Sequence, residues 1–509
     1  MIASARASFL RNGLRWSVLL LVIASVSLST TSCKTGVNPV SGNTRAVGYT
    51  WEEEVQLGKQ ADQQIQQQYG VYEDEELQRY VDRVAREVLA VSHMRREGTA
   101  EKFRNTEFEF RILDSDIINA FALPGGYVYV TRGLLAHLNN EAQLAVVLGH
   151  EIGHVAARHA SQQAARQQFT QLGVLAAGVA GGLAFGGDAA QNIVGLTGQA
   201  AQLFSLSYSR GNERESDRLG VEYATLAGYD AAEGAEFFTT LKRKQSQSGQ
   251  SIPSWQSTHP DPGQREDTIV QLAAEWDQRI AGPSSLVEQR AFYNRIEDLV
   301  LGKNPRQGYE DGDVFYHPDL RFEFPVPAGW QLVNQPRQVV MGEPDGGAQI
   351  SFGFSQESTT GAAATAFVGQ EGLTTLDRSS TTVNGYEAER VLISATPQQG
   401  QEIRALVYFI AYDGNVYRFL GVTTSGAYDR FRPTFERTMT GFDDLRDPAR
   451  LNVQPTRVDI QTASAARVFA EFVRPSALPE DMTTEDIAIL NQLDLQERVE
   501  QGQLLKLPN

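Results

Sequence analysis

Residues 146–159 read VVLGHEIGHVAARH, and this stretch holds three of the chain's seven histidines. In a helix each residue turns by about 100°, so His150, Glu151 and His154 would fall within about one third of the circumference. Two imidazoles one turn apart can bind the same metal ion, and the carboxylate beside them can reach a water molecule on that ion. The alternative is a polar helix face with coincidental histidines. A further metal ligand elsewhere in the chain would favour the metal site over this alternative.

A tetrahedral Zn²⁺ needs one more protein ligand besides two imidazoles and a water. His159 lies about 140° further round the helix from the second histidine, so a structural or surface role is favoured for it. Glu213 and Asp217 lie one helical turn apart in SYSRGNERESDRLG, residues 207–220. Glu213 offers an anionic oxygen, and Asp217 can accept the second ring N–H of a ligating histidine. Glu215 competes as the ligand but faces away from this side of the helix. By itself such a pair indicates a solvated face, whereas together with the histidine motif it predicts a ligand.

The segments around this motif alternate between helical and strand spacing. Apolar residues recur every three or four positions in the expected helices and at alternate positions in the expected strands. The turn Pro124, Gly125, Gly126 joins two of the strands, and Asn140 can cap the helix that carries the histidines. The expected helices cover 51–70, 74–92 and the residues from Glu141 onward, and the expected strands cover 108–112, 119–122 and 127–131.

The combination of NAFALPGG, HEIGHVAARH and YSRGNERESDRLG resembles the family of CAAX-prenyl-protease, HtpX and BepA-type zinc metallopeptidases, which are gluzincins. The resemblance covers roughly residues 50–272 and is greatest to the periplasmic lipoprotein branch, because the chain shows no multi-span membrane segment. It implies an endopeptidase with one Zn²⁺ per chain. The residues implied for the site are His150, His154 and Glu213 as zinc ligands, Glu151 as general base, and Asp217 behind a ligand.

The same resemblance implies two further functional elements. The family has a histidine in the region of STHPDPGQRED, residues 257–267, where His259 stands before a helix start expected at Asp261 and Pro262. His259 can steady the oxyanion or can occupy the open position of zinc in a resting, latent form. Asn119 and Ala120 begin a stretch that resembles the family's edge strand, to which an extended peptide adds as a further strand. Unfolded or misassembled polypeptides are therefore the expected substrates.

Residues 1–33 have the layout of an export signal, with three arginines ahead of an apolar run over residues 16–28. Cys33 is the only cysteine of the chain and resembles the cysteine of a lipobox, although Thr30 stands where leucine is usual. We therefore expect a periplasmic protein anchored to the outer membrane by a lipid on Cys33. A permanent N-terminal anchor helix is the alternative.

The remaining chain predicts an α+β multidomain protein: a mainly helical gluzincin-type peptidase domain with a small edge-strand sheet, then an α/β domain with an antiparallel sheet and a small C-terminal segment. The formal net charge of −17 argues against a nucleic-acid partner. The Gly- and Ala-rich stretch after Leu172 is interpreted as a lid or packing element. The expected parts are a signal peptide over 1–33, a linker over 34–50, the peptidase domain over 51–305, the α/β domain over 308–445 and the C-terminal segment over 446–509.

The two C-terminal parts carry no cluster of catalytic residue types, so binding or positioning is their default role. In the α/β domain we expect helices over 365–373 and 427–442, among strands. The ending ILNQLDLQERVEQGQLLKLPN, residues 489–509, resembles the second half of a LysM glycan-binding module, but the usual glycine-rich opening is replaced by QTASAARVFAEF. Peptidoglycan is thus a further candidate partner.

Two classes of function follow from these observations. The first is an active zinc endopeptidase that hydrolyses unfolded or misassembled cell-envelope proteins. The second is a chaperone or assembly factor for outer-membrane proteins on the same scaffold, with latent or no proteolysis. Retention of the three ligand types and of Glu151 favours the first.

Overall fold

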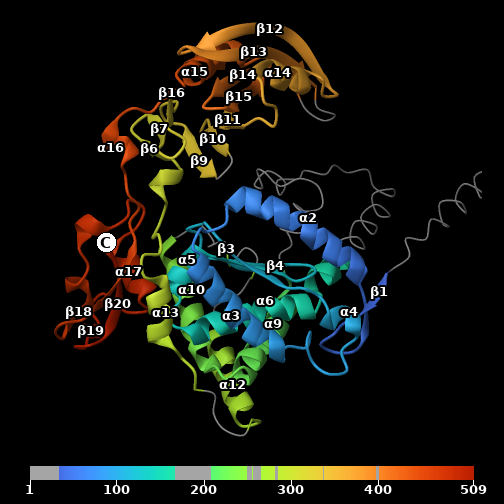
Figure 1. Ribbon diagram of the computed structural model, residues 1–509, viewed down its shortest axis with the longest axis vertical. Helices are drawn as coiled ribbons and strands as arrows, with labels where there is room; N and C mark the ends of the chain where they lie inside the picture. The colour runs from blue at the N-terminus through green and yellow to red at the C-terminus, as the bar shows by residue number, and fades with distance from the viewer. Residues whose placement is uncertain are drawn as a thin grey trace, which may run out of the picture.

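The structure is a computed structural model (Figure 1). It describes residues 34–166, 208–248, 255, 259, 265–280, 285–335, 338–396 and 401–509. The predicted signal segment with Cys33, the apolar run over 172–185 and the helix start expected at residue 261 lie outside the described residues. Within the described ranges, no helix combines the length and the apolar character needed to cross a membrane.

Side-chain caps start two of the helices that frame the site. The side chain of Asn140 accepts a hydrogen bond from the N–H of Gln143, as predicted, and the side chain of Asp74 accepts one from the N–H of Leu77. The helices of this part are α2 (Trp51–Tyr69), α3 (Glu75–Val91), α4 (Glu101–Arg104), α5 (Arg132–His137), α6 (Glu141–Ala156), α9 (Arg210–Leu226), α10 (Gly234–Ser248), α12 (Arg265–Asp277) and α13 (Gln289–Ile296).

A three-stranded sheet lies beside these helices, with the strand order β3 (Glu109–Leu113), β5 (Tyr127–Thr131), β4 (Ala120–Leu123). Strand β3 is parallel to β5, and β4 is antiparallel to β5, so β4 forms one edge. Gly125 and Gly126 form the predicted turn with φ of 81° and 104°. A Cβ on Gly125 would lie 2.5 Å from the Cα of Val55, so the turn requires glycine there. The expected small sheet with an edge strand is thus present.

Residues 34–50, expected to be a linker, contain an ordered hairpin of β1 (Thr35–Val37) and β2 (Thr44–Ala46). The Gly, Pro and Asn residues that suggested a tether form its turn, in which the N–H of Asn38 donates to the carbonyl of Asn43 at 2.9 Å. The side-chain amide of Asn38 also donates to the carbonyl of Ala157 at 2.9 Å. The hairpin is therefore attached to the end of the histidine-bearing helix.

The predicted second domain is an antiparallel sheet domain (Figure 1). Its seven-stranded sheet has the order β12-β13-β14-β15-β11-β10-β9, and a four-stranded sheet has the order β16-β8-β7-β6. Its elements are β6 (Tyr309–Asp311), β7 (Val314–His317), β8 (Phe322–Pro325), β9 (Gln331–Gln335), β10 (Gln338–Gly342), β11 (Ala348–Phe354), α14 (Thr360–Val368), β12 (Leu373–Val383), β13 (Tyr386–Ala395), β14 (Ile403–Tyr412), β15 (Asn415–Thr424), α15 (Tyr428–Thr440) and β16 (Asp443–Asp444).

The helix expected over 365–373 was misplaced. Helix α14 ends at Val368, and residues from Leu373 form β12, an edge strand whose side chains are mostly exposed. Without a buried face the strand shows no apolar alternation, so the sequence pattern could not indicate it.

The C-terminal segment has no separate core. Strands β17 (Val458–Thr462) and β20 (Leu504–Pro508) pair with each other, and α17 (Thr484–Leu490) packs into the same apolar cluster as α3, α5 and α6. The ammonium of the buried Lys506 donates to the carbonyls of Ala136 and Leu138 at 2.6 and 2.8 Å, beside the end of α5. Peptidase part and C-terminal segment therefore form one body, and the LysM-like character of the segment stays a prediction.

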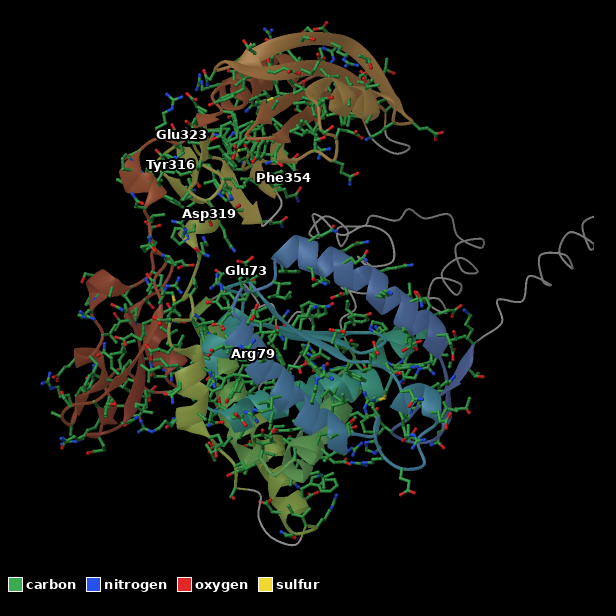
Figure 2. All side chains as sticks on the ribbon, viewed as in Figure 1. Glu73, Arg79, Tyr316, Asp319, Glu323 and Phe354 are labelled. Carbon is green, nitrogen blue, oxygen red and sulfur yellow. The ribbon has the colours of Figure 1, made fainter. Side chains whose placement is uncertain are left out.

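The antiparallel sheet domain is inserted into this body through two adjacent chain segments. Val300 and Arg457 form an antiparallel bridge, and the N–H of Leu301 donates to the carbonyl of Thr456 at 2.8 Å. Tyr316 and Glu323 of the inserted domain are labelled in Figure 2, well separated in the view from Glu73 and Arg79 of the body. Its apolar clusters contain only residues of the domain itself.

Replacing residues 304–454 by a short Gly/Ser linker is expected to preserve the body, because the segments on either side of the deletion already pair. Removing residues 456–509 is expected to abolish its cooperative unfolding, because Ile487, Leu505 and their neighbours belong to the common core. Near-ultraviolet circular dichroism during thermal unfolding measures both. A C-terminally truncated chain that unfolds like the full-length protein would contradict the shared core.

Candidate metal centre

The site forms where helices α6 and α9 cross at two glycines. A Cβ on Gly149 would lie 2.9 Å from the carbonyl oxygen of Gly220, and a Cβ on Gly220 would lie 2.9 Å from the backbone nitrogen of His150. Distances below 3.0 Å are essentially never observed for real Cβ atoms. The two backbones can therefore approach this closely only with glycine at both positions. This approach brings a side chain of α9 within reach of the histidines on α6.

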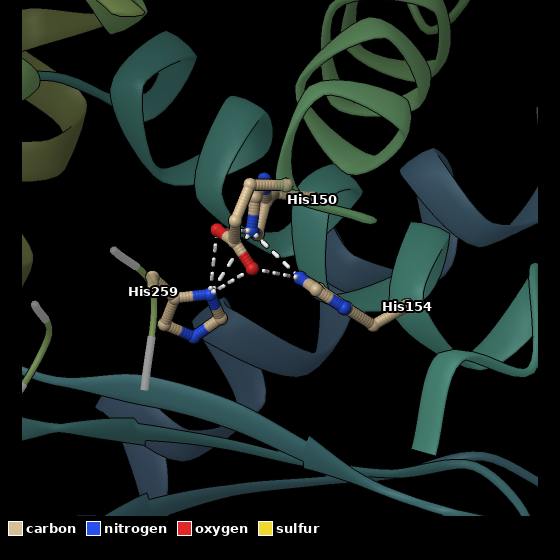
Figure 3. A group of neighbouring side chains, drawn as sticks. His150, His154 and His259 are labelled. Atoms are coloured by element: carbon tan, nitrogen blue, oxygen red, sulfur yellow. Dashed lines mark hydrogen bonds and ion pairs between the residues drawn. The ribbon is translucent and has the colours of Figure 1, made fainter. Parts of the chain in front are cut away.

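The structure brings the three predicted ligands together (Figure 3). The Nε2 atoms of His150 and His154 lie 2.9 Å apart. The carboxylate of Glu213 lies 3.5 Å from each of these nitrogens, through Oε2 and Oε1 respectively. All three side chains are buried, and two imidazole nitrogens with one carboxylate oxygen are a donor set that suits Zn²⁺.

His259 lies at the same group of atoms. Its Nδ1 is 3.0 Å from Oε2 of Glu213 and 3.3 Å from Nε2 of His150, and the four potential ligand atoms lie within 4.8 Å of one another. The ring stacks on Trp255 with centroids 4.5 Å apart, and its backbone N–H donates to the carbonyl of Trp255 at 2.7 Å. Of the two roles considered for His259, this position matches that of a further ligand.

Glu151 is fully buried, and within the part of the chain that the structure describes neither carboxylate oxygen has a hydrogen-bond partner. Its Oε1 lies 3.6 Å from Nε2 of His259, beyond hydrogen-bonding distance. Burial raises the pKa of Glu151. The carboxylate next to the ligand group is thus free to exchange a proton with a water or a substrate.

Asp217 and Arg265 lie behind the ligands. Oδ1 of Asp217 is 3.0 Å from Nδ1 of His150, the contact expected for a residue that fixes the tautomer of a ligand. Arg265 donates from Nε to Oδ2 of Asp217 at 2.9 Å and from Nη1 to Oε2 of Glu213 at 3.3 Å. Burial lowers the pKa of His150, but hydrogen bonds to Asp217 and Glu213 outweigh it and raise this pKa to about 9.

Sequence reasoning missed Arg265, which stands in the quoted stretch STHPDPGQRED six residues after His259. A signal was available, because two buried carboxylates on one helix call for a cation. Burial opposes ionisation of Asp217, but the Arg265 guanidinium holds its pKa below the ordinary value.

His159, for which a structural or surface role was favoured, is buried next to a ligand. Its Nδ1 lies 3.1 Å from Nδ1 of His154, and its Nε2 lies 3.2 Å from Oε2 of Glu215. The ring of Tyr208 stacks on the ring of His154, with centroids 4.0 Å apart. Burial lowers the pKa of His154 well below its usual range, so this ring is neutral, as a metal ligand must be.

The predicted substrate strand lies along one side of the site. Ala122, Leu123 and Pro124 line a small cavity together with His154 and Tyr208. The carbonyl of Asn119 accepts the N–H of Thr131, and the N–H of Asn119 donates to Oγ1 of Thr131. In an antiparallel pair such residues alternate, so the backbone groups of Ala120 and Ala122 point away from β5, although all four residues of β4 are buried.

Residues 73–273 match the model of Peptidase family M48. A putative beta-barrel assembly-enhancing protease of Vibrio cholerae is 29% identical over 232 residues, 45% of each chain. The beta-barrel assembly-enhancing protease of Yersinia pestis is 36% identical over 166 residues, 31% of this chain and 33% of the relative. The mitochondrial metalloendopeptidase OMA1 of Bos taurus is 33% identical over 169 residues, 32% of this chain and 31% of the relative.

The chain spans less than half the length of each of these relatives. The family domain covers the described metal centre up to Arg265, and the resemblance inferred from the three motifs is confirmed.

Replacing Arg265 by methionine is expected to lower the free energy of unfolding by about 3–5 kcal/mol, because two buried carboxylates lose their cation. Urea unfolding in the presence of a chelator measures this change. Arg279→Met is the matched control, since Arg279 pairs with Glu275 at the surface and its loss should cost less than about 1 kcal/mol. Equal costs for the two variants would contradict the role of Arg265.

Proposed function

We propose, from the peptidase family M48 domain in residues 73–273, that the protein is a zinc-dependent endopeptidase. The single observation that carries this proposal is the convergence of His150, His154 and Glu213 beside the buried carboxylate of Glu151, which accepts no hydrogen bond from the described residues. A catalytic zinc site has three protein ligands and keeps its fourth position for a water molecule, and a buried carboxylate that accepts no hydrogen bond can act on that water.

In this proposal a zinc ion, when bound, polarises the scissile carbonyl and makes a water molecule more acidic. Glu151 takes the proton of that water and later transfers it to the leaving amine. Asp217 accepts the N–H of His150 and so keeps the lone pair of Nε2 directed at the site. Arg265 keeps Asp217 ionised for this task.

The position of His259 makes the arrangement seen in the structure a resting form of the enzyme. With Nδ1 among the ligand atoms, His259 occupies the place that a water or a substrate carbonyl needs. Catalysis then requires that His259 leave the group. Because Trp255 holds the ring by stacking and by a backbone hydrogen bond, the two residues move together.

The substrate is an extended polypeptide that pairs with β4 along the side that faces away from β5. Ala120 and Ala122 supply backbone donors and acceptors, and the buried Oδ1 of Asn119, which has no partner among the described residues, can accept an N–H of the peptide. Pairing through the backbone selects for an extended conformation and not for a sequence. Unfolded or misassembled polypeptides therefore fit this site.

The protein is proposed to act in the cell envelope. Two of the relatives are named beta-barrel assembly-enhancing proteases, and the N-terminal segment has the layout of an export signal before Cys33. Both support an envelope protein, periplasmic and lipid-anchored to the outer membrane, that acts on misassembled outer-membrane proteins. The inserted domain and the C-terminal segment then serve to hold clients, and peptidoglycan stays a candidate ligand of the latter.

Glu151→Gln is expected to lower the rate of casein hydrolysis by about 10²–10⁴-fold, because the general base is lost, while one zinc per chain is retained. Peptide release and metal content of the same preparation measure both. Glu141→Gln is the matched control on α6, since Glu141 pairs with Arg83 and Tyr229, and it should stay active. If the wild type cleaved neither casein nor a misfolded outer-membrane protein while Glu151→Gln kept its full effect in cells, the assembly-factor function would replace this one.

His259→Ala is expected to raise peptidase activity about tenfold or more, because the resting form can no longer close the site. The rate of hydrolysis of a fluorogenic peptide measures this change. His317→Ala, in the inserted domain, is the control and should leave the rate unchanged. A loss of activity in His259→Ala would show instead that this residue stabilises the oxyanion.

A further inference from the structure

A chain of polar side chains continues from His154 away from the ligand group. Nε2 of His154 faces His150 and Glu213, whereas Nδ1 of the same ring faces Nδ1 of His159 at 3.1 Å. The other nitrogen of His159 lies 3.2 Å from Oε2 of Glu215. Ser216 Oγ also lies 3.3 Å from Nδ1 of His159.

We propose that His159 and Glu215 are positioning residues that fix the tautomer and the orientation of the metal ligand His154. This inference rests on the proposed zinc site. It gives His154 the support that Asp217 gives directly to His150.

The hydrogen bonds in this chain can run in only one direction when a metal is bound. Nε2 of His154 must present its lone pair to the metal, so the proton of the neutral ring is on Nδ1. Nδ1 of His159 then accepts that proton's hydrogen bond, and the proton of His159 is on Nε2. Nε2–H donates to Glu215, whose carboxylate can only accept. Each link therefore enforces the protonation that metal binding by His154 requires.

The backbone explains why His159 reaches His154 at all. Arg158 adopts a left-handed conformation with φ of 58°, which ends the helix and turns the chain. Its guanidinium donates to Oε1 of the buried Glu54 at 2.6 and 3.0 Å and to the carbonyl of Tyr49 at 2.9 Å. A strained conformation persists only where its surroundings hold it, so this turn is built to place His159.

The last link of the chain lies near the surface. The side chain of Glu215 is 23% exposed, and Nη1 of Arg45 in β2 lies 3.5 Å from Oε2. A buried imidazole pair would be costly without these hydrogen bonds, whereas apolar side chains would fill the same space at no such cost. The polar residues at these positions thus indicate a task beyond packing.

Zinc affinity of the full-length protein, measured by competition with a chromophoric chelator, tests the inference. His159→Phe keeps a ring of similar size but removes both nitrogens, and it should raise the zinc dissociation constant about 10- to 100-fold. His317→Phe is the matched control in the inserted domain and should leave the constant unchanged. The visible spectrum of the cobalt-loaded protein should change in His159→Phe and not in the control, because the ligand field of His154 is altered.

Glu215→Ala distinguishes a hydrogen-bonded chain from His154 through His159 to Glu215 from simple packing of these side chains. Acting through His159, Glu215→Ala should weaken zinc binding several-fold alone and should add nothing in the His159→Phe background. Additive effects, or wild-type affinity and cobalt spectrum in His159→Phe, would overturn the inference. Should His159→Phe fail to fold, Glu215→Ala decides alone, since its side chain is partly exposed.

Zinc binding and peptide cleavage by the wild-type protein test this inference and the proposed function separately. If the wild-type protein bound zinc but cleaved nothing, the proposed peptidase function would be wrong. The zinc affinities of the variants would still test the role of His159 and Glu215. A wild-type protein that binds no divalent metal would overturn both.

Discussion

The metal centre depends on the close crossing of α6 and α9 at Gly149 and Gly220. The carboxylate of Glu213 meets the two histidines of α6 because the backbones of the two helices approach closely at these glycines. A methyl group at either glycine would have to push the helices apart. The ligands would then separate although every ligating residue was still present. Two residues without side chains thus decide whether three side chains can share one ion.

Helix α9 supplies three carboxylates with three different tasks. Glu213 lies among the ligand atoms, Asp217 contacts the ring of His150, and Glu215 reaches the ring of His159 on the far side of His154. Arg265 balances the first two of these charges. Burying several acids so close together would be unfavourable if they all repelled one another, so the arrangement needs the positive charge of this arginine.

Local spacing predicted the parts of the site that lie within one helix. The positions of His150, Glu151 and His154 follow from helical periodicity, and Asn140 as the helix cap follows from its residue type. Contacts between distant segments could not be read in this way. The role of Gly220 depends on a neighbour about seventy residues away. His159 turns back toward His154 because Arg158, which is hydrogen-bonded to Glu54, ends the helix in a left-handed conformation. Strand β12 was missed since an exposed edge strand has no buried face to leave a pattern.

The inserted sheet domain and the C-terminal segment differ in how they affect the core around the candidate metal centre. Residues near 300 and 457 pair with each other, so the inserted sheet domain contributes nothing to the core around the metal centre. Its surface can change without disturbing the ligands. The C-terminal segment is different, because Lys506 binds the end of α5 just before α6 and α17 packs into the same apolar cluster as α6. A substitution there acts on the same cooperative unit that holds His150 and His154. Changes on the surface of the inserted domain can therefore leave the candidate ligands in place, whereas changes in the buried part of the C-terminal segment also affect the stability of the site.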